Sequence, residues 1–204
     1  MLLMLAMLSG PAMMTASAQA QAQAPAPVRT VERVDLQRYL GEWFEIARFP
    51  NRFQRTCAGD VRATYARRPD GRIDVINRCR TAQGAMQEVQ GVARVVDLNT
   101  SAKLKVRFAP GFLSFLPFVW GDYWVIGLAG DYSWAVVGSP DRAYLWILAR
   151  TPVLSADRYD SALAAARANG FDVQRLVKTS QAATSGAIYT PDDLEADHDK
   201  NVSP

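Results

Sequence analysis

Residues 103–108 read KLKVRF and show the clearest alternation of polar and apolar side chains in the chain. A period of two predicts a β-strand with one buried face, because successive side chains point to opposite faces of a sheet. Working outward from this stretch, we expect seven more short strands joined by hairpin-length connections. Their ranges are Gly41–Phe49, Val61–Ala66, Ile73–Cys79, Val89–Val95, Tyr123–Leu128, Trp134–Gly138 and Tyr144–Ala149.

The connections between these strands favour an all-β fold that closes into an eight-stranded up-and-down antiparallel barrel. Asp70-Gly71, Gly130-Asp131 and Pro140-Asp141 are typical turn sequences between neighbouring strands. A barrel removes the exposed sheet edges and can enclose one small ligand. A β-sandwich is the competing architecture, but strands that follow one another at short spacing argue against its crossing connections.

One helix is expected after the last long strand, packed on the outside of the barrel. Ser155 suits its N-cap and Gly170 its end, while Tyr159, Leu163 and Ala166 form one apolar stripe. A short strand over Val173–Val177 is expected to follow.

The chain divides into four parts by composition. Residues 1–18 resemble a signal peptide, with an apolar run over Leu2–Leu8 and a cleavage motif at Ala16-Ser17-Ala18, although no Lys or Arg precedes the run. Residues 19–30 read as a flexible linker, residues 31–178 as the barrel with its helix, and residues 179–204 as a disordered acidic tail. We therefore expect export to the periplasm, with association with the outer membrane as a further possibility.

The net charge of +3 conceals a difference between the tail and the rest of the chain. The tail contributes −4, which leaves +7 for the remainder. We interpret the positive part as a solvated surface, with contact to anionic lipid headgroups as the alternative. The arginines are scattered and form no basic helix, so no nucleic-acid partner is expected.

The two cysteines, Cys57 and Cys79, are expected to form one disulfide, because a lone pair in an exported protein is usually oxidised. No cysteine lies near the leader, so no lipidated N-terminal cysteine is expected.

Three short motifs, in the expected order and at the expected strand positions, resemble the signatures of the lipocalin family. Gly41-Glu42-Trp43 matches G-x-W at the start of the first strand, and Gly130-Asp131-Tyr132 matches T-D-Y with Gly in place of Thr. Arg150 matches the arginine that follows the last strand. The stretches at 39–54, 70–77 and 140–152 resemble the bacterial branch of the family most, whose members are often outer-membrane lipoproteins.

The resemblance implies that the signature residues are structural and that a small hydrophobic molecule binds inside the barrel. We expect Arg150 to stack on Trp43 and seal the closed end. Strand parity gives as candidates for the cavity Ala47, Phe49, Tyr65, Ala93, Val106 and Phe108. Parity does not choose a face for Tyr123, Tyr144 and Trp146, which are further candidates with ordinary barrel packing as the alternative. Asn77 is a candidate if it faces inward. At the mouth we expect Arg52 and Arg55, beside Arg48, and the aromatic residues Phe112, Phe115 and Phe118 of the apolar stretch 110–120. That stretch could guide an acyl chain, touch a membrane, plug the barrel or form a homodimer contact.

The resemblance implies a fatty acid or lysophospholipid as ligand, stored or transported for maintenance of the cell envelope. A tetrapyrrole- or retinoid-like ligand is the alternative within binding. An enzymatic role is not expected, because the single histidine, His198, lies in the tail and no metal or cofactor site is evident. The remaining enzymatic hypothesis is a lipid-modifying enzyme with Cys57 as its nucleophile.

Overall fold

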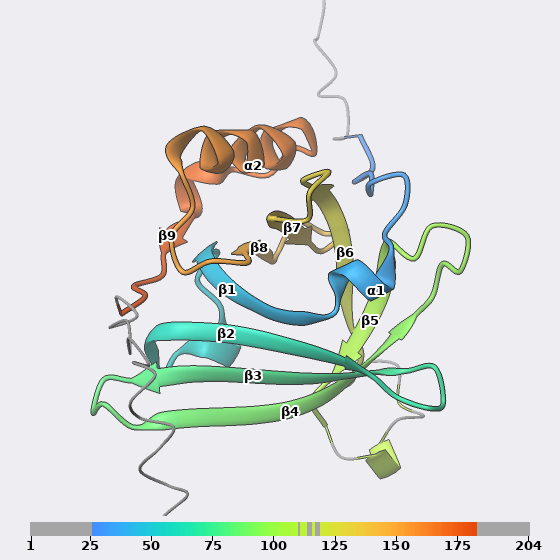
Figure 1. Ribbon diagram of the computed structural model, residues 1–204, viewed down its shortest axis with the longest axis horizontal. Coiled ribbons are helices and arrows are strands. Elements are labelled where there is room, and N and C mark those ends of the chain that lie inside the picture. The colour runs from blue at the N-terminus through green and yellow to red at the C-terminus, as the bar shows by residue number, and fades with distance from the viewer. Residues whose placement is uncertain (1–25, 110, 114–115, 117–118, 183–204) are drawn as a thin grey trace, which may run out of the picture.

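Nine antiparallel strands form one sheet in residues 26–109, 111–113, 116 and 119–182, the part of the chain that this computed structural model describes. The strands are β1 (Gly41–Arg48), β2 (Cys57–Arg67), β3 (Ile73–Thr81), β4 (Met86–Val95), β5 (Lys103–Arg107), β6 (Gly121–Leu128), β7 (Trp134–Gly138), β8 (Leu145–Ala149) and β9 (Val177–Lys178). Strands β2 to β8 pair in chain order, and β1 pairs with both β8 and β2 (Figure 1). The predicted eight-stranded barrel is therefore confirmed, with β9 added beside β1.

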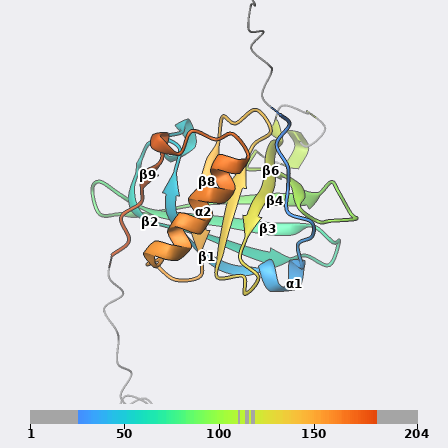
Figure 2. The same ribbon diagram turned by 90° about the horizontal axis from the view of Figure 1, so that it is seen from above.

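Two α-helices accompany the barrel in the described part of the chain. The four-residue α1 (Leu36–Tyr39) lies at one end, and α2 (Ala156–Ala168) lies across the outside, as Figure 2 shows. Short 3₁₀ turns are η1 (Arg52–Gln54), η2 (Gly111–Leu113) and η4 (Val173–Arg175). None of the helices within the described ranges is long and apolar enough to cross a membrane.

The apolar side chains form two clusters on opposite sides of the barrel wall. The interior cluster contains Trp43, Tyr65, Val75 and Leu104. The outer cluster lies between α2 and the wall and contains Ile147, Ala162, Ala166 and Phe171. Strands β6 and β7 supply residues to both clusters, because their successive side chains point alternately to the interior and to the outer face that α2 covers.

An irregularity in β1 decides which of its residues face inward. The pairing of β1 with β8 shifts by one residue between Glu45 and Ala47. An extra residue in one strand reverses the side that later residues face. Trp43 and Glu45 therefore face the interior, whereas Ala47 and Phe49 belong to the outer cluster. The prediction that Ala47 and Phe49 line the cavity is therefore wrong.

The segment after α2 closes a gap in the barrel wall. Strands β1 and β2 pair only over Gly41–Phe44 and Arg62–Tyr65. Beyond that point β9 pairs with β1, and the carbonyl of Ser180 accepts a hydrogen bond from the amide of Asp60 on β2, 2.8 Å away. The Gln181 side chain donates to the carbonyls of both Glu45 and Val61. Residues 177–182 thus bridge the two strands.

Two predicted boundaries need correction. Residues 179–182 do not belong to the expected disordered tail, because Thr179 to Ala182 are hydrogen-bonded to the barrel; residues 183–204 lie outside the described residues. Val28 and Arg29 do not belong to the expected flexible linker, because Val28 is buried in the outer cluster and the amide of Arg29 donates to Asn169. The strand expected over Val173–Val177 is a 3₁₀ turn followed by the two residues of β9.

Cys57 and Cys79 form the predicted disulfide, which joins the start of β2 to β3 across 22 residues of chain. Replacing both cysteines by serine is expected to lower the free energy of unfolding by about 3 kcal/mol, because the unfolded chain gains the freedom that the cross-link removes. Urea unfolding of the double variant measures this change. An unaltered unfolding midpoint would contradict the expectation.

Candidate functional site

The two ends of the barrel differ, and this difference locates the site. At one end Asp35 caps α1, its side chain accepting a hydrogen bond from the amide of Gln37 at 2.9 Å. The guanidinium carbon of Arg150 lies 3.9 Å from the centre of the Trp43 ring, and Arg150 also donates to the carbonyls of Arg38 and Glu42. The expected stack is therefore present, and this end of the barrel is closed.

The other signature residues support the same closed end. Tyr132 adopts a positive φ of 62°, and its hydroxyl accepts a hydrogen bond from the amide of Asp35. Asp131 accepts a hydrogen bond from the amide of Ser133 and pairs with Arg158 of α2 at 3.1 Å. Gly41 has a φ of +93°, which a residue with a side chain rarely adopts. Asp131 and Tyr132 thus connect the β6–β7 turn to α2 and to the residue that caps α1.

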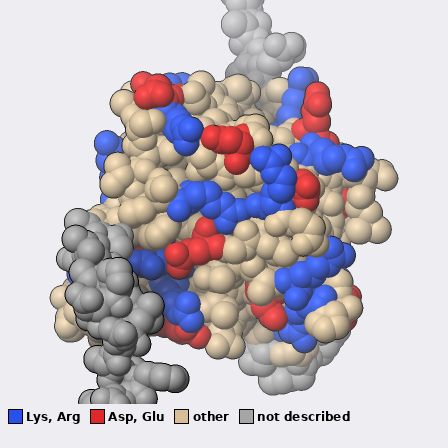
Figure 3. All heavy atoms as spheres, viewed as in Figure 1, with Lys and Arg blue, Asp and Glu red and all other residues tan. Residues whose placement is uncertain are grey.

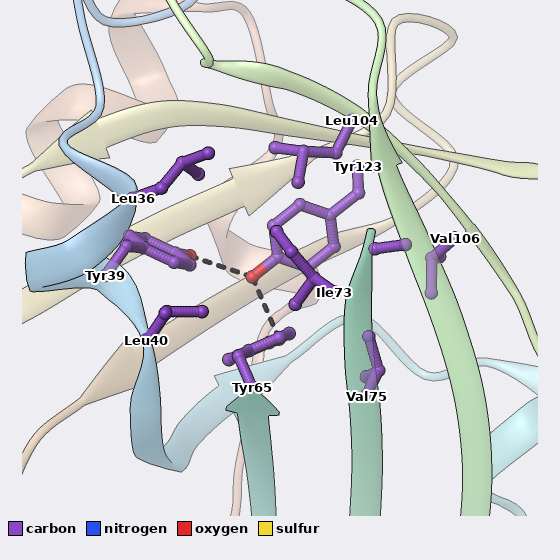
Figure 4. Close-up of a pocket in the computed structure, with 10 residues that line it drawn as sticks. Leu36, Tyr39, Leu40, Tyr65, Ile73, Val75, Leu104, Val106 and Tyr123 are labelled. Carbon is purple, nitrogen blue, oxygen red and sulfur yellow. Dashed lines mark hydrogen bonds between the residues drawn. The ribbon is translucent and has the colours of Figure 1, made fainter. Parts of the chain in front are cut away.

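Three tyrosine hydroxyls meet inside the barrel just above α1 (Figure 4). The Tyr123 hydroxyl lies 2.8 Å from that of Tyr39 and 3.0 Å from that of Tyr65. The cavity beside them has a volume of about 10 Å³, which is the space that one water molecule needs. The part of the interior beside α1 is therefore filled by side chains.

Burial keeps these phenols protonated at alkaline pH. Burial raises the pKa of Tyr65 from 10.0 to about 12, and it also raises the pKa of Tyr39 and of Tyr123. The unfolded chain releases these protons near pH 10, whereas the folded chain retains them, so stability is expected to fall as the pH rises from about 10 towards 12. In an ultraviolet titration, ionisation of the three phenols should coincide with unfolding. A single step near pH 10 with the fold intact would contradict this expectation.

An aromatic surface lies at the open end. Trp146 pairs with Arg48 of β1 and Val137 of β7, and it packs on the interior cluster. Its ring is stacked on Tyr144, with centres 5.8 Å apart and planes 6° apart. Phe53 of η1 lies 5.7 Å from Tyr144 and is 64% exposed. We call Phe53, Tyr144 and Trp146 the mouth aromatics.

A buried acidic residue lies beneath the mouth aromatics. Glu45 is 3% exposed, and one of its carboxylate oxygens accepts hydrogen bonds from Arg48 at 2.7 Å and from Thr179. The other oxygen accepts from the Gln54 side chain at 2.6 Å. A buried charge needs such partners, since water cannot reach it. Glu45 thereby holds together β1, the β1–β2 connection and the segment after α2.

A second hollow, of about 560 Å³, lies along β3 and β4, and its lining includes Val75 of the interior cluster and its register partner Gly91. Asp74 and Val92 line it and are paired in register, whereas the preceding Ile73 and the following Ala93 face the interior. Charged side chains surround this hollow, including the ion pair between Arg68 and Asp74. On the face shown in Figure 3, basic and acidic side chains likewise lie side by side.

A sequence profile described as "Lipocalin-like domain" matches residues 34–181. The chain is a lipocalin. Members of this family bind small hydrophobic molecules, so the interior described above is the region where binding is expected.

Characterised relatives agree with this assignment over most of the chain. The lipocalin is 43% identical to outer membrane lipoprotein Blc of Escherichia coli K12 over 155 residues, which cover 76% of this chain and 83% of Blc. It is 42% identical to temperature-induced lipocalin-1 of Arabidopsis thaliana over 159 residues, 77% and 84% of the two chains. It is 31% identical to mouse apolipoprotein D, covering 74% and 79%.

Solved structures support the fold. Insecticyanin of the tobacco hornworm Manduca sexta superposes with a TM-score of 0.61 at 18% identity, covering 77% of this chain and 86% of insecticyanin. Lobster apocrustacyanin A1 superposes with a TM-score of 0.58 at 17% identity, covering 78% and 83%.

Apart from Ala47 and Phe49, which lie in the outer cluster, the predicted cavity residues are found in three regions. Tyr65, Ala93, Val106 and Tyr123 line the filled, closed half. Tyr144 and Trp146 lie at the open end, as does Asn77, which pairs in register with Ala63 and Val89 on the interior face. Phe108 is 39% exposed, and its ring packs against Gly91, where a Cβ would lie only 2.6 Å from it.

The predicted mouth residues are only partly described. Arg52 and Arg55 are exposed at the open end, with Arg52 placed 5.0 Å from the centre of the Phe53 ring. Phe112 belongs to η2, whereas Phe115 and Phe118 lie outside the described residues.

Several important residues were missed from the sequence. Helix α1 with Tyr39 was missed, although Asp35 before an apolar residue is a typical helix start. Glu45 and Gln54 were missed because polar residues on a strand and in a loop are normally exposed. The position of Glu45, two residues after the inward Trp43, was the available signal. The disulfide removes the free thiol that the enzymatic hypothesis for Cys57 requires.

Proposed function

We propose that this lipocalin binds a fatty acid or lysophospholipid in the open half of its barrel and stores or transports it. The observation that carries the proposal is the set of mouth aromatics, of which Trp146 packs on the same interior cluster as the small residue Ala63. Rigid aromatic rings beside small side chains suit an alkyl chain, which needs apolar area and little hydrogen bonding.

The polar head of such a lipid would lie at the rim. Arg52 and Arg55 are exposed there and could contact a phosphate or carboxylate. The closed half offers no charge partner of this kind in its lining, which consists of tyrosine and aliphatic side chains. The expected orientation is therefore chain inward and head outward.

We further propose that the protein acts in the cell envelope. Support comes from the leader-like residues 1–18 and from the bacterial relatives, which are named outer membrane lipoproteins. Export to the periplasm, with association with the outer membrane, fits a role in maintaining envelope lipids. The apolar stretch 110–120 would contact the membrane surface during loading. Charged substitutions at Phe115 and Phe118 should then weaken co-sedimentation with vesicles; unchanged co-sedimentation would favour a plug or a homodimer contact.

Titration with a fluorescent long-chain fatty acid tests the binding proposal. Trp146→Ala should weaken its affinity at least about tenfold, because a large buried apolar contact is lost. Trp134→Ala is the matched control, since Trp134 packs in the outer cluster and should leave the affinity unchanged. Equal affinities of Trp146→Ala and the unmodified protein would refute the proposed site. A visible absorbance band of the purified protein would instead indicate a tetrapyrrole- or retinoid-like ligand.

A further inference from the structure

The hydrogen-bonded side chains under the mouth aromatics determine how Trp146 faces the ligand. The indole N–H of Trp146 donates to Gln54 Oε1 at 3.1 Å, and Asn51 Nδ2 donates to the same oxygen at 2.7 Å. Gln54 Nε2 donates in turn to Glu45 Oε2 at 2.6 Å. Gln54 therefore links the buried carboxylate to the ligand-facing indole.

The side chain at position 54 has to accept a hydrogen bond from the Trp146 indole and donate one to the Glu45 carboxylate. The indole N–H can only donate and the Glu45 carboxylate, when ionised, can only accept, so the orientation of the Gln54 amide is fixed by its surroundings. A methionine of similar shape would leave the indole N–H and a carboxylate oxygen without these partners. A glutamate would place two carboxylates against each other. Glutamine is thus the residue that this position requires.

We propose that Gln54 is a positioning residue that sets the ligand preference of the barrel through Trp146. With its N–H bound to Gln54, the indole offers the ligand a ring surface and no hydrogen-bond donor. Its plane is held nearly parallel to Tyr144, with 6° between the two. At this depth the barrel accordingly selects an alkyl or other hydrocarbon part of the ligand over a part that carries an oxygen acceptor. This inference rests on the proposed binding function.

The network that fixes Gln54 is itself anchored from several elements. Asn51 donates from the same connection, where its side-chain oxygen also accepts from the amides of Phe53 and Gln54. Arg48 and Thr179 hold the other carboxylate oxygen of Glu45. Because the oxygen and the nitrogen of the Gln54 amide both have defined partners, this amide has little freedom to turn. The position of the indole is therefore set before a ligand arrives.

The test combines a spectroscopic and a binding measurement on Gln54→Met. In ¹⁵N-labelled, ligand-free protein, the indole N–H resonance of Trp146, assigned by its loss in Trp146→Phe, should shift upfield and exchange faster with water. The affinity for a fluorescent long-chain fatty acid should fall about fivefold, the effect of one typical hydrogen bond. Gln90→Met is the matched control, because the Gln90 side chain is exposed and donates to Glu88; it should change neither quantity.

A double-mutant comparison shows whether Gln54 acts through Trp146. In the Trp146→Phe background, Gln54→Met should cause no further loss of affinity. An equal loss in both backgrounds, or an unshifted indole resonance, would overturn the proposal. If Gln54→Met does not fold, the proposal is still tested by the unmodified protein. Rapid exchange of the Trp146 indole N–H with water in that protein would also overturn the proposal. Failure of the unmodified protein to bind the fatty acid would refute the proposed function alone, since the resonance is measured without ligand.

Discussion

Replacing Glu45 by alanine is expected to lower the free energy of unfolding by about 3–5 kcal/mol, the range for breaking a buried ion pair. The Arg48 side chain, only 14% exposed, would lose its charge partner inside the barrel. The side chains of Gln54 and Thr179 would lose their acceptor at the same time. Urea unfolding followed by circular dichroism measures the loss.

Glu42→Ala is the matched control, because Glu42 lies on the same strand and also pairs with an arginine. Its partner is Arg62 at 3.6 Å, and the two side chains are 42% and 41% exposed. Such a solvated pair contributes no more than about 1 kcal/mol. Equal destabilisation by the two substitutions would show that Glu45 has no special role in the barrel.

Replacing Trp43 by alanine is expected to cost about 3–5 kcal/mol, as for other large aromatic residues in protein cores. Trp43 is fully buried, donates to the carbonyl of Tyr39 at 2.8 Å, and supports the Arg150 guanidinium. Loss of the Trp43 side chain would open a cavity at the closed end and leave the Arg150 guanidinium without the indole on which it stacks. The free energy of unfolding is again the quantity to measure.

Trp124→Ala is the matched control, because it makes the same substitution on the outer side of the barrel. Trp124 is only half-buried on the outer side, and the Lys103 Nζ lies 4.5 Å from the centre of its ring. Its replacement should cost clearly less than that of Trp43. If the two variants unfold at the same urea concentration, Trp43 does not seal the closed end in the way described.

The barrel could be predicted from the sequence because its strands alternate cleanly where one face is solvated. Lys103 to Arg107 shows this best, and the observed β5 covers these residues. The resemblance to the lipocalin signatures predicted that Arg150 stacks on Trp43 at the closed end, and this contact is present. The disulfide followed from the count of two cysteines.

The candidate site was harder to predict, for reasons that individual residues illustrate. Ala47 and Phe49 keep the parity of Trp43 in the sequence, yet the extra residue in β1 turns them toward α2. Strand parity alone cannot detect such a shift. Glu45 reads as a surface acid, and its burial depends on Arg48, Gln54 and Thr179, the last of which lies 134 residues away. Long-range polar contacts of this kind leave no periodic signal.

The arrangement of the two ends explains how one barrel can be both stable and able to bind. Packing is concentrated at the closed end, where Trp43, Tyr39 and the tyrosine hydroxyls fill the interior. At the open end, Gln54 is bonded to Glu45 and accepts a hydrogen bond from the Trp146 indole, while Phe53 is exposed. Fixed polar contacts of this kind are what the proposed site needs in order to be preorganised.

Native mass spectrometry of the mature protein, purified from a cell-envelope extract and followed by lipid analysis of whatever dissociates, tests the central claim most directly. The account predicts a protein-bound mass that matches one fatty acid or lysophospholipid for each barrel. The Trp146→Ala variant, purified in the same way, should retain less of it. An empty barrel that also takes up no added lipid would contradict the proposed function and would leave only the fold.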